Sequence, residues 1–500
     1  MRFQKAILLS FIIIFSTARS YGQQAAALDS MRSSLSKAKT PEEKVFWLDM
    51  LSRTAMNVNP GQADEYGNQL ITFAEETRDR KLMVRAYMSN GIRCGYFTGQ
   101  KDYTTRSIEY FNKALKIARQ NKMEEETGAI QLKLCAVHLA IPDKDKALNY
   151  INQAFSLIST LKNDSLKAEA HNSYGLVYQA RNEKTLSLRH FLNGLQIAEE
   201  TNIPELRRSC YLHLSNFYSR IEDHDKAIDY YMKANKELDH VKEGNVGYQR
   251  VIDFNSIGNL FANKKNYDIA LSYFERSIAL ADSLKFSTLK IPGYLSLLNQ
   301  HLRIDHPQQA LEYMNSSSGL NLKKYLSNMG LGGHIDQVYA VIYSKLKVFD
   351  SAGFYFNKAL PYFEQKTSET NRINFYVQVG DYYQKTDNYD KAIGYFQKVK
   401  EMGERNGQLE TTQAALKHLD SLYVKKGNFK LANQYNGLYY QYKDSIDKLK
   451  KENELTQIEA FDEQQRHQRA LAAAQELKEK RNRIQYMGII IGIAVLFVSL

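Results

Sequence analysis

The sequence predicts an all-α fold: a solenoid of helix hairpins with a period of about 40 residues, followed by a long polar helix and a transmembrane helix. A small residue recurs at spacings of 40, 40, 40, 43, 40, 42, 40 and 40 positions, and an aromatic or large apolar residue follows four positions later in all but the last copy. Near the C-terminus, a polar stretch without Gly or Pro leads into an apolar run. The recurring small residues are Ser107, Ala147, Ser187, Ala227, Ala270, Ala310, Ala352, Ala392 and Ala432.

The repeating unit is clearest in Ile373–Met402. The small residue Gly380 lets a second helix approach closely, Tyr383 fills the space beside it, and Ala392 is the small contact on the returning helix. This pattern resembles a tetratricopeptide repeat (TPR), and the resemblance implies a right-handed TPR-type α-solenoid. The period exceeds the roughly 34 residues usual for that family, and the usual proline is mostly missing, so we expect longer helices or connections.

Composition excludes several classes of protein. The formal net charge of +12 comes from Lys and Arg spread over the repeats and the C-terminal stretch, without a nucleic-acid-binding module, so we expect no nucleic-acid partner within this stretch. Only three cysteines are present, which argues against a disulfide framework. We interpret Cys94, Cys135 and Cys210 as small hydrophobic residues that fill space in the helices.

The N-terminus predicts export. Arg2 and Lys5 precede an apolar run, and a small-residue exit follows, so residues 1–22 are interpreted as a signal peptide. An uncleaved N-terminal anchor is the alternative. Residues 23–41 are predicted to be a loose lead-in.

Residues 42–442 are predicted to form one TPR-like solenoid of about nine or ten units, with an atypical first unit and no internal domain boundary. Ser316–Leu326 is interpreted as an irregular stretch. Residues 443–485 are rich in helix-forming residues and predict a long charged helix. Its heptad pattern is incomplete, and a homodimeric coiled coil through 443–485 remains one interpretation.

Residues 486–500 are apolar to the last residue and are interpreted as the start of a transmembrane helix that attaches the chain to a membrane. Fifteen residues reach only about 22 Å at 1.5 Å per residue, which is less than the roughly 30 Å core of a bilayer. We therefore expect the sequence to be the front part of a longer protein. The basic residues just before this run oppose the exported orientation, because positive charge usually marks the cytoplasmic side.

No motif for catalysis, phosphate binding or zinc binding occurs in the sequence. We therefore expect no enzymatic activity within these residues, no cofactor and no metal.

The remaining candidate is a binding surface on the first helix of each hairpin. In the TPR pattern, positions nine and thirteen of that helix tend to face the groove. Asn offers both a donor and an acceptor to a peptide backbone, and Arg or Lys binds carboxylates. We therefore expect a protein or peptide ligand in this groove, although Asn and Lys are common at these positions in TPR sequences whether or not they bind. The candidate groove contacts are Asn216, Arg220, Asn255, Asn259, Asn263, Asn299, Arg303, Lys345, Asp381 and Lys385.

The order of the parts resembles the sensor half of bacterial membrane-bound histidine kinases and transcriptional regulators, in which periplasmic TPR arrays precede a cytoplasmic output domain. The resemblance implies a receptor in the inner membrane with its TPR region in the periplasm. Ligand binding would be relayed through residues 443–485, and a histidine kinase or DNA-binding domain would follow Leu500. Two alternatives stay open: a membrane-tethered envelope scaffold without signalling output, and a cytosolic TPR adaptor with a tail anchor.

Overall fold

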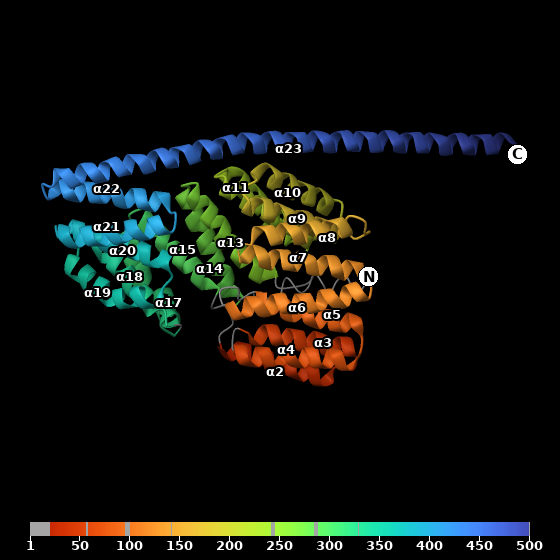
Figure 1. Ribbon diagram of the computed structural model, residues 1–500, viewed down its shortest axis with the longest axis horizontal. Coiled ribbons are helices and arrows are strands. Elements are labelled where there is room, and N and C mark those ends of the chain that lie inside the picture. The colour runs from red at the N-terminus through yellow and green to blue at the C-terminus, as the bar shows by residue number, and fades with distance from the viewer. Residues whose placement is uncertain are drawn as a thin grey trace. The chain divides into compact units, whose positions relative to one another are not determined.

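The computed structural model describes residues 21–499 except 57–58, 96–100, 142, 242–245, 285–288 and 329. Every regular element within these residues is a helix, and Figure 1 shows most of the helices arranged as successive antiparallel hairpins. The predicted all-α solenoid is therefore correct. Helix A denotes the first helix of a hairpin and helix B the second.

The chain divides into two compact units. The first unit comprises Met1–Asp253, Ala281–Thr288 and Thr456–Leu500, and the second comprises Phe254–Leu280 and Leu289–Leu455. This division could not be predicted, because the hairpin period continues across it without a Pro- or Gly-rich linker.

The first unit contains eleven complete helices among its described residues. They are α2 (Tyr21–Lys37), α3 (Pro41–Ala55), α4 (Pro60–Glu76), α5 (Arg80–Gly95), α6 (Lys101–Gln120), α7 (Glu124–Ala140), α8 (Lys144–Ile158), α9 (Asp164–Ala180), α10 (Lys184–Glu199), α11 (Pro204–Arg220) and α12 (His224–Glu237).

Three further helices contribute to both units, and eight lie within the second. The shared helices are α13 (Val246–Asn263), α14 (Tyr267–Ser283) and α23 (Phe429–Ser499). The helices within the second unit are α15 (Lys290–Arg303), α16 (Pro307–Asn315), α17 (Ser317–Asn328), α18 (Gly332–Lys345), α19 (Phe349–Lys366), α20 (Glu369–Lys385), α21 (Tyr389–Arg405) and α22 (Leu409–Lys425).

The small residues that define the repeat all lie in the core. Each of the nine is at most 2% exposed, on a helix B that packs against the preceding helix A. Several hairpins close through one contact, in which the ring four residues after the small residue lies directly against a glycine of helix A, as Phe396 lies against Gly380. Because the glycine has no side chain, the two helix backbones approach closely.

The turn between helices A and B is the same in most hairpins. Its middle residue has a positive φ of 57–64°, and the next backbone N–H bonds to the carbonyl five residues earlier, as Asn388 bonds to Tyr383 at 2.9 Å. This geometry ends a helix in a Schellman motif. An Asp or Asn then often caps helix B, as Asn388 does by accepting a hydrogen bond from the Lys391 N–H. The middle residues are Asn182, Glu222, Lys265, Asp305, Lys347 and Asp387.

Two predicted irregular segments are helical, so those predictions were wrong. The lead-in contains α2, in which Leu28 is 3% exposed and packs with Leu51, Ala55 and Ala63. Its Leu28, Met31 and Leu35 recur at helical spacing, which explains why the segment folds onto α3. The stretch Ser316–Leu326 lies almost wholly in α17, an extra helix that packs beside α16 and α18.

The long polar helix begins earlier than predicted. Helix B of the last hairpin does not end near residue 442 but continues as one helix, α23, from Phe429 to Ser499. Among the described residues, no helix contains a stretch that is both long and apolar enough to cross a membrane. The structure thus lends no support to the membrane helix predicted from Tyr486. Residues 1–20 of the predicted signal peptide lie outside the described residues.

Candidate binding surface

Helices A of the second unit carry a row of exposed or half-buried polar side chains. Each side chain lies one or five positions after a residue that faces helix B, for example Gly258 in α13 and Gly380 in α20, so it points away from helix B. We call this set the polar row: Asn259 and Asn263 on α13, Asn299 and Arg303 on α15, Lys345 on α18, and Asp381 and Lys385 on α20.

The asparagines of the polar row are available to a ligand. Asn259, Asn263 and Asn299 are exposed, and within the described residues their side chains make no hydrogen bond. Asn255 differs because it is half-buried, and its side-chain oxygen has no hydrogen-bond partner among the described residues. An unpaired buried amide oxygen is costly, so Asn255 is a candidate for contact with a ligand or water at the base of the row.

The charged end of the row contains two separate pairs, Lys345–Asp305 and Asp381–His418. Lys345 donates to Asp305 at 2.9 Å, from the end of α18 to the turn after α15. This bond, and more weakly the nearby charge of Lys385, lowers the pKa of the Asp305 carboxyl. Lys345 is therefore already paired, whereas Lys385 is exposed and makes no ion pair within the described residues. Lys385 is thus the freer cation for a carboxylate.

Asp381 and His418 form the second pair. Oδ1 of Asp381 lies 3.8 Å from Nε2 of His418, whose Nδ1 lies 3.1 Å from the Gln384 side-chain oxygen. Burial raises the pKa of Asp381 against the opposing effect of His418, and burial likewise lowers the pKa of His418. The His418 ring also stacks on Phe396 at 4.2 Å, which fixes its orientation. Burial thus disfavours the charged form of both side chains.

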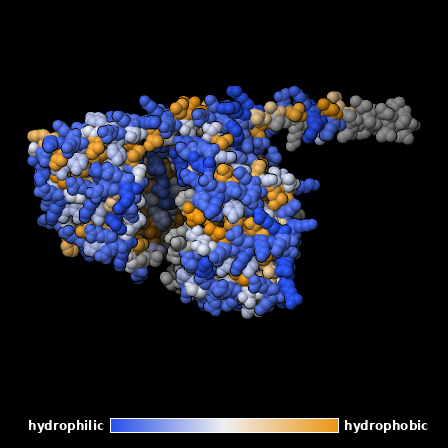
Figure 2. Space-filling model, in the orientation of Figure 1, coloured by the Kyte–Doolittle hydropathy of each residue, from blue (hydrophilic) through white to orange (hydrophobic). Residues whose placement is uncertain are grey.

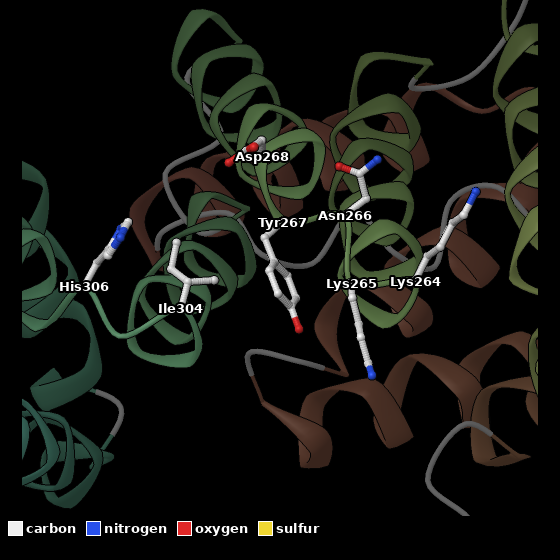
Figure 3. A pocket seen from close by; sticks show the side chains of 7 residues that line it. All are labelled: Lys264, Lys265, Asn266, Tyr267, Asp268, Ile304 and His306. Atoms are coloured by element: carbon white, nitrogen blue, oxygen red, sulfur yellow. The ribbon is translucent and has the colours of Figure 1, made fainter.

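A shallow cavity of about 530 Å³ lies beside the row, where the A–B turns of two successive hairpins meet (Figure 3). Lys265 and the Tyr267 ring point in the same direction in Figure 3, and Arg303 of the row lies over the Tyr267 ring at 5.7 Å. This cavity was not predicted from the sequence, since most of its residues belong to turns that the repeat pattern does not describe, and Tyr267 and Asp268 begin α14. It is lined by Lys264, Lys265, Asn266, Tyr267, Asp268, Ile304 and His306.

Two predicted groove residues lie in the first unit. Asn216 and Arg220 are exposed on α11, which belongs to the first unit. Within the second unit, the structure places the remaining candidates along successive A helices.

The three thiols are structural. Cys94, Cys135 and Cys210 are buried and form no disulfide. Burial raises the pKa of Cys135 to about 12 and that of Cys210 to about 11, so both remain protonated and unreactive at neutral pH. No group of three or more His, Cys, Asp or Glu in the described part of the chain could hold a metal ion.

Comparisons with known proteins agree with the fold. A tetratricopeptide repeat model matches residues 209–236 and 373–403, which fall on the hairpins α11–α12 and α20–α21. The crystal structure of the apo form of RapI is 12% identical and superposes with a TM-score of 0.54, covering 72% of this chain and 98% of RapI. At that identity the likeness shows a shared fold alone.

Other solved structures are more distant. The apo form of the quorum sensor NprR from B. thuringiensis is 12% identical, with a TM-score of 0.44, and the match covers 80% of this chain and 99% of NprR. A Rap protein complexed with competence and sporulation factor is 11% identical, with a TM-score of 0.42, and covers 78% of this chain and 99% of that one. A comparison with curated protein sequences finds no match.

Proposed function

We propose that this chain, whose helix hairpins are tetratricopeptide repeats, binds an extended peptide or protein segment along the polar row of the second unit. The observation that carries the proposal is the row itself: exposed asparagines on α13 and α15, followed by basic side chains on α15, α18 and α20. No catalytic motif competes with this interpretation.

The chemistry of the row suits a peptide in an extended conformation. An extended backbone presents N–H and C=O groups that no internal hydrogen bond satisfies, and a side-chain amide can pair with both. Asn259 and Asn299 occupy the same position on the A helices of successive hairpins, so they offer such pairs at repeated intervals. Arg303 and Lys385 then favour a ligand with a carboxylate near one end.

We further propose that the chain is the exported sensor region of a bacterial signalling receptor in the inner membrane, with the repeats in the periplasm. The support is the signal-peptide pattern of residues 1–22 and the apolar run that begins at Tyr486. In this proposal, a ligand on the row shifts the A helices of the second unit. Because α23 begins in that unit as helix B of the last hairpin, the shift reaches residues 443–485 and the membrane.

Binding is tested with a displayed library of random peptides. Captured peptides are labelled, and their dissociation constants are measured by fluorescence anisotropy for the wild type and for Asn259→Ala with Arg303→Ala. We expect at least a tenfold loss of affinity in the double variant. The matched control removes an amide and a cation from exposed positions on α16 and α17, with Gln308→Ala and Lys324→Ala. Equal affinity of wild type and Asn259→Ala/Arg303→Ala rules out the polar row as the binding site.

Export and output need separate experiments. Alkaline phosphatase fused after Asp282 is active if the repeats are exported, whereas activity of a cytosolic reporter at the same site favours a cytosolic adaptor. The reading frame after codon 500 discriminates the receptor from the scaffold: a kinase or DNA-binding domain supports the receptor, and an immediate stop codon supports a tethered scaffold without output.

A further inference from the structure

Within the first unit, residues 456–467 of α23 lie on α10, on the C-terminal end of α11 and on α12; Figure 1 shows α23 beside α10 and α11. Arg189 donates two hydrogen bonds to the Glu463 carboxylate, at 2.7 and 3.3 Å. The Glu463 side chain is only 9% exposed, so its charge depends on this partner.

Hydrogen bonds fix the register of this contact. The Gln464 side chain accepts from the Tyr218 hydroxyl and donates to the Tyr230 hydroxyl, both at 3.0 Å. Gln457 donates at 2.6 Å to the carbonyl of Ile221, the C-cap residue that follows α11, and so satisfies a group at a helix terminus. These hydrogen bonds fix which residues meet. Because most of the contact is polar, water can replace its hydrogen bonds when α23 separates from α10–α12, so the net stabilisation is modest.

The face of α23 that makes this contact has the spacing of a coiled-coil seam. Over the whole residue, backbone included, Thr456 is 9% exposed, Ala460 2% and Glu463 7%, and His467 is half-buried. These residues follow one another at intervals of four, three and four. When intervals of four and three alternate along a helix they average 3.5 residues, which is the period at which two helices pack along their length in a coiled coil.

The same face continues past the contact but is no longer covered. Steps of seven residues from Glu463 reach Ala470, Leu477 and Ile484. Leu477 is 70% exposed and Ile484 is 66% exposed. Figure 2 shows hydrophobic residues on α23 among the hydrophilic ones. Large apolar side chains in line with an occupied interface indicate a longer interface that is only partly filled.

We propose that this face of α23, the α23 seam, pairs with the same face of a second copy of the chain in a parallel two-stranded coiled coil, and that docking on α10–α12 blocks this pairing. The seam comprises Thr456, Ala460, Glu463, His467, Ala470, Ala474, Leu477, Arg481 and Ile484. Docking and pairing use the same side of residues 456–467, so one chain cannot do both.

The composition of the seam fits an equilibrium between two states. Leu477 and Ile484 gain an apolar partner only in the paired state. Glu463, His467 and Arg481 lower the stability of a coiled coil, because polar residues at seam positions reduce its apolar core. In the docked state Glu463 has Arg189 instead. Docking of α23 on α10–α12 therefore competes with dimerisation. Any change that weakens the contact between α23 and α10–α12 favours the dimer. This inference does not depend on the ligand of the polar row.

The first test releases α23 without altering the seam. Arg189→Glu places a negative charge against Glu463 and leaves the sequence of α23 unchanged. We expect the association constant of the purified full chain, measured by analytical ultracentrifugation, to rise at least tenfold. Adding Leu477→Lys, outside the docking contact, is expected to return the protein to monomer. Lys167→Glu makes the same charge change on α9, where Lys167 pairs with Asp164, and is expected to leave the association constant unchanged.

The second test locks the docked state. Thr185→Cys and Glu459→Cys replace two side chains that contact at 3.0 Å, and a short bismaleimide joins the new thiols while the three native cysteines stay buried. We expect the joined chain to stay monomeric under conditions in which Arg189→Glu dimerises. The yield of this cross-link also reports docking, and it should fall when Arg189→Glu is added.

Three results overturn the proposal. In the first, the cross-link yield falls in Arg189→Glu but the chain stays monomeric. In the second, the dimer persists with Leu477→Lys or in the joined chain. In the third, the cross-link yield is unchanged both in Arg189→Glu and after Tyr218→Phe and Tyr230→Phe are added, which would show that the described bonds do not hold α23.

Discussion

Gly175 on α9 and Phe191 on α10 are in direct contact: a Cβ added to Gly175 would lie 2.4 Å from Cε1 of the ring. The same relationship joins Gly258 to Phe274 at 2.5 Å and Gly380 to Phe396 at 2.9 Å. No real Cβ tolerates these distances, so the ring must move if a side chain is introduced. The contact sets how closely helices A and B of these hairpins approach.

We predict that Gly175→Ala destabilises the α9–α10 hairpin by about 1–3 kcal/mol, the usual cost of overpacking a core. The control is Gly394→Ala, because the added Cβ meets open space on the helical α21 and should stabilise by about 0.5–1 kcal/mol. Hydrogen exchange of the two hairpins in dilute urea measures both effects. If Gly175→Ala instead increases the protection of the α9–α10 amides, the Phe191 ring moves aside without a cost in stability. The close contact would then not determine how closely the two helices pack.

The N-terminal hairpins depend on one carboxylate. Asp64 accepts a hydrogen bond from Arg93 at 2.6 Å and two from Arg106 at 2.9 Å, and the Arg93 side chain is 1% exposed. We predict that Asp64→Ala costs about 3–5 kcal/mol, because it leaves a buried cation without its partner. The loss should appear as faster hydrogen exchange in α4–α6.

The control for this prediction is Asp145→Ala. Asp145 pairs with Arg181 at 2.7 Å but is 93% exposed, so its loss should cost less than about 1 kcal/mol. Similar costs for the two substitutions would show that burial of Arg93 does not set the strength of its ion pair.

We predict that stability falls on acidification through the pair His171–His190. Their Nδ1 atoms lie 3.0 Å apart, and burial, with the neighbouring charges of His171 and Arg189, lowers the pKa of His190 to about 4. The unfolded chain binds a proton near pH 6.5, whereas the folded chain binds it only near pH 4. The free energy of unfolding should therefore decrease as the pH falls from about 6.5 to about 4.

The variant His190→Phe keeps an aromatic ring in the stack with Tyr174 but cannot titrate. Urea unfolding followed across this pH range should give a flatter dependence in His190→Phe than in the wild type. His240→Gln changes an exposed histidine and serves as the control. An unchanged slope in His190→Phe would mean that other groups cause the acid sensitivity.

The periodic parts of this fold could be predicted from the sequence. Ala392 and its counterparts recur at nearly constant spacing, so both the hairpins and the polar row on helix A follow from counting residues. The turns could not be predicted in the same way, because Lys265 and Asp305 adopt a positive φ that their residue types do not reveal. Helix α17 was missed because it has no place in the repeat pattern.

Long-range contacts also escaped prediction. Arg189 and Glu463 are 274 residues apart, and neither belongs to a motif. The half-buried pair Asp381–His418 joins α20 to α22, and only Asp381 was a candidate. The position of a residue on its own helix could thus be predicted from the repeat. The residue that it contacts could not, because that depends on how helices from distant segments of the chain pack together.

We predict that ligands of the polar row carry a carboxylate that Lys385 recognises. Lys385→Gln should weaken binding of a captured peptide severalfold, and the loss should shrink as salt is raised, since exposed charges are screened. Lys345→Gln should have a smaller effect, because Lys345 is already bonded to Asp305. Anisotropy titrations at two salt concentrations compare the variants. Equal losses for both lysines would place the carboxylate elsewhere.

Hydrogen–deuterium exchange of the full chain with and without a captured peptide tests binding along the polar row most directly. We predict added protection in α13, α15, α18 and α20, strongest near the segments that hold Asn259, Asn299 and Lys385. Protection confined to helices B, or to the first unit, would contradict this prediction and place the ligand on another surface.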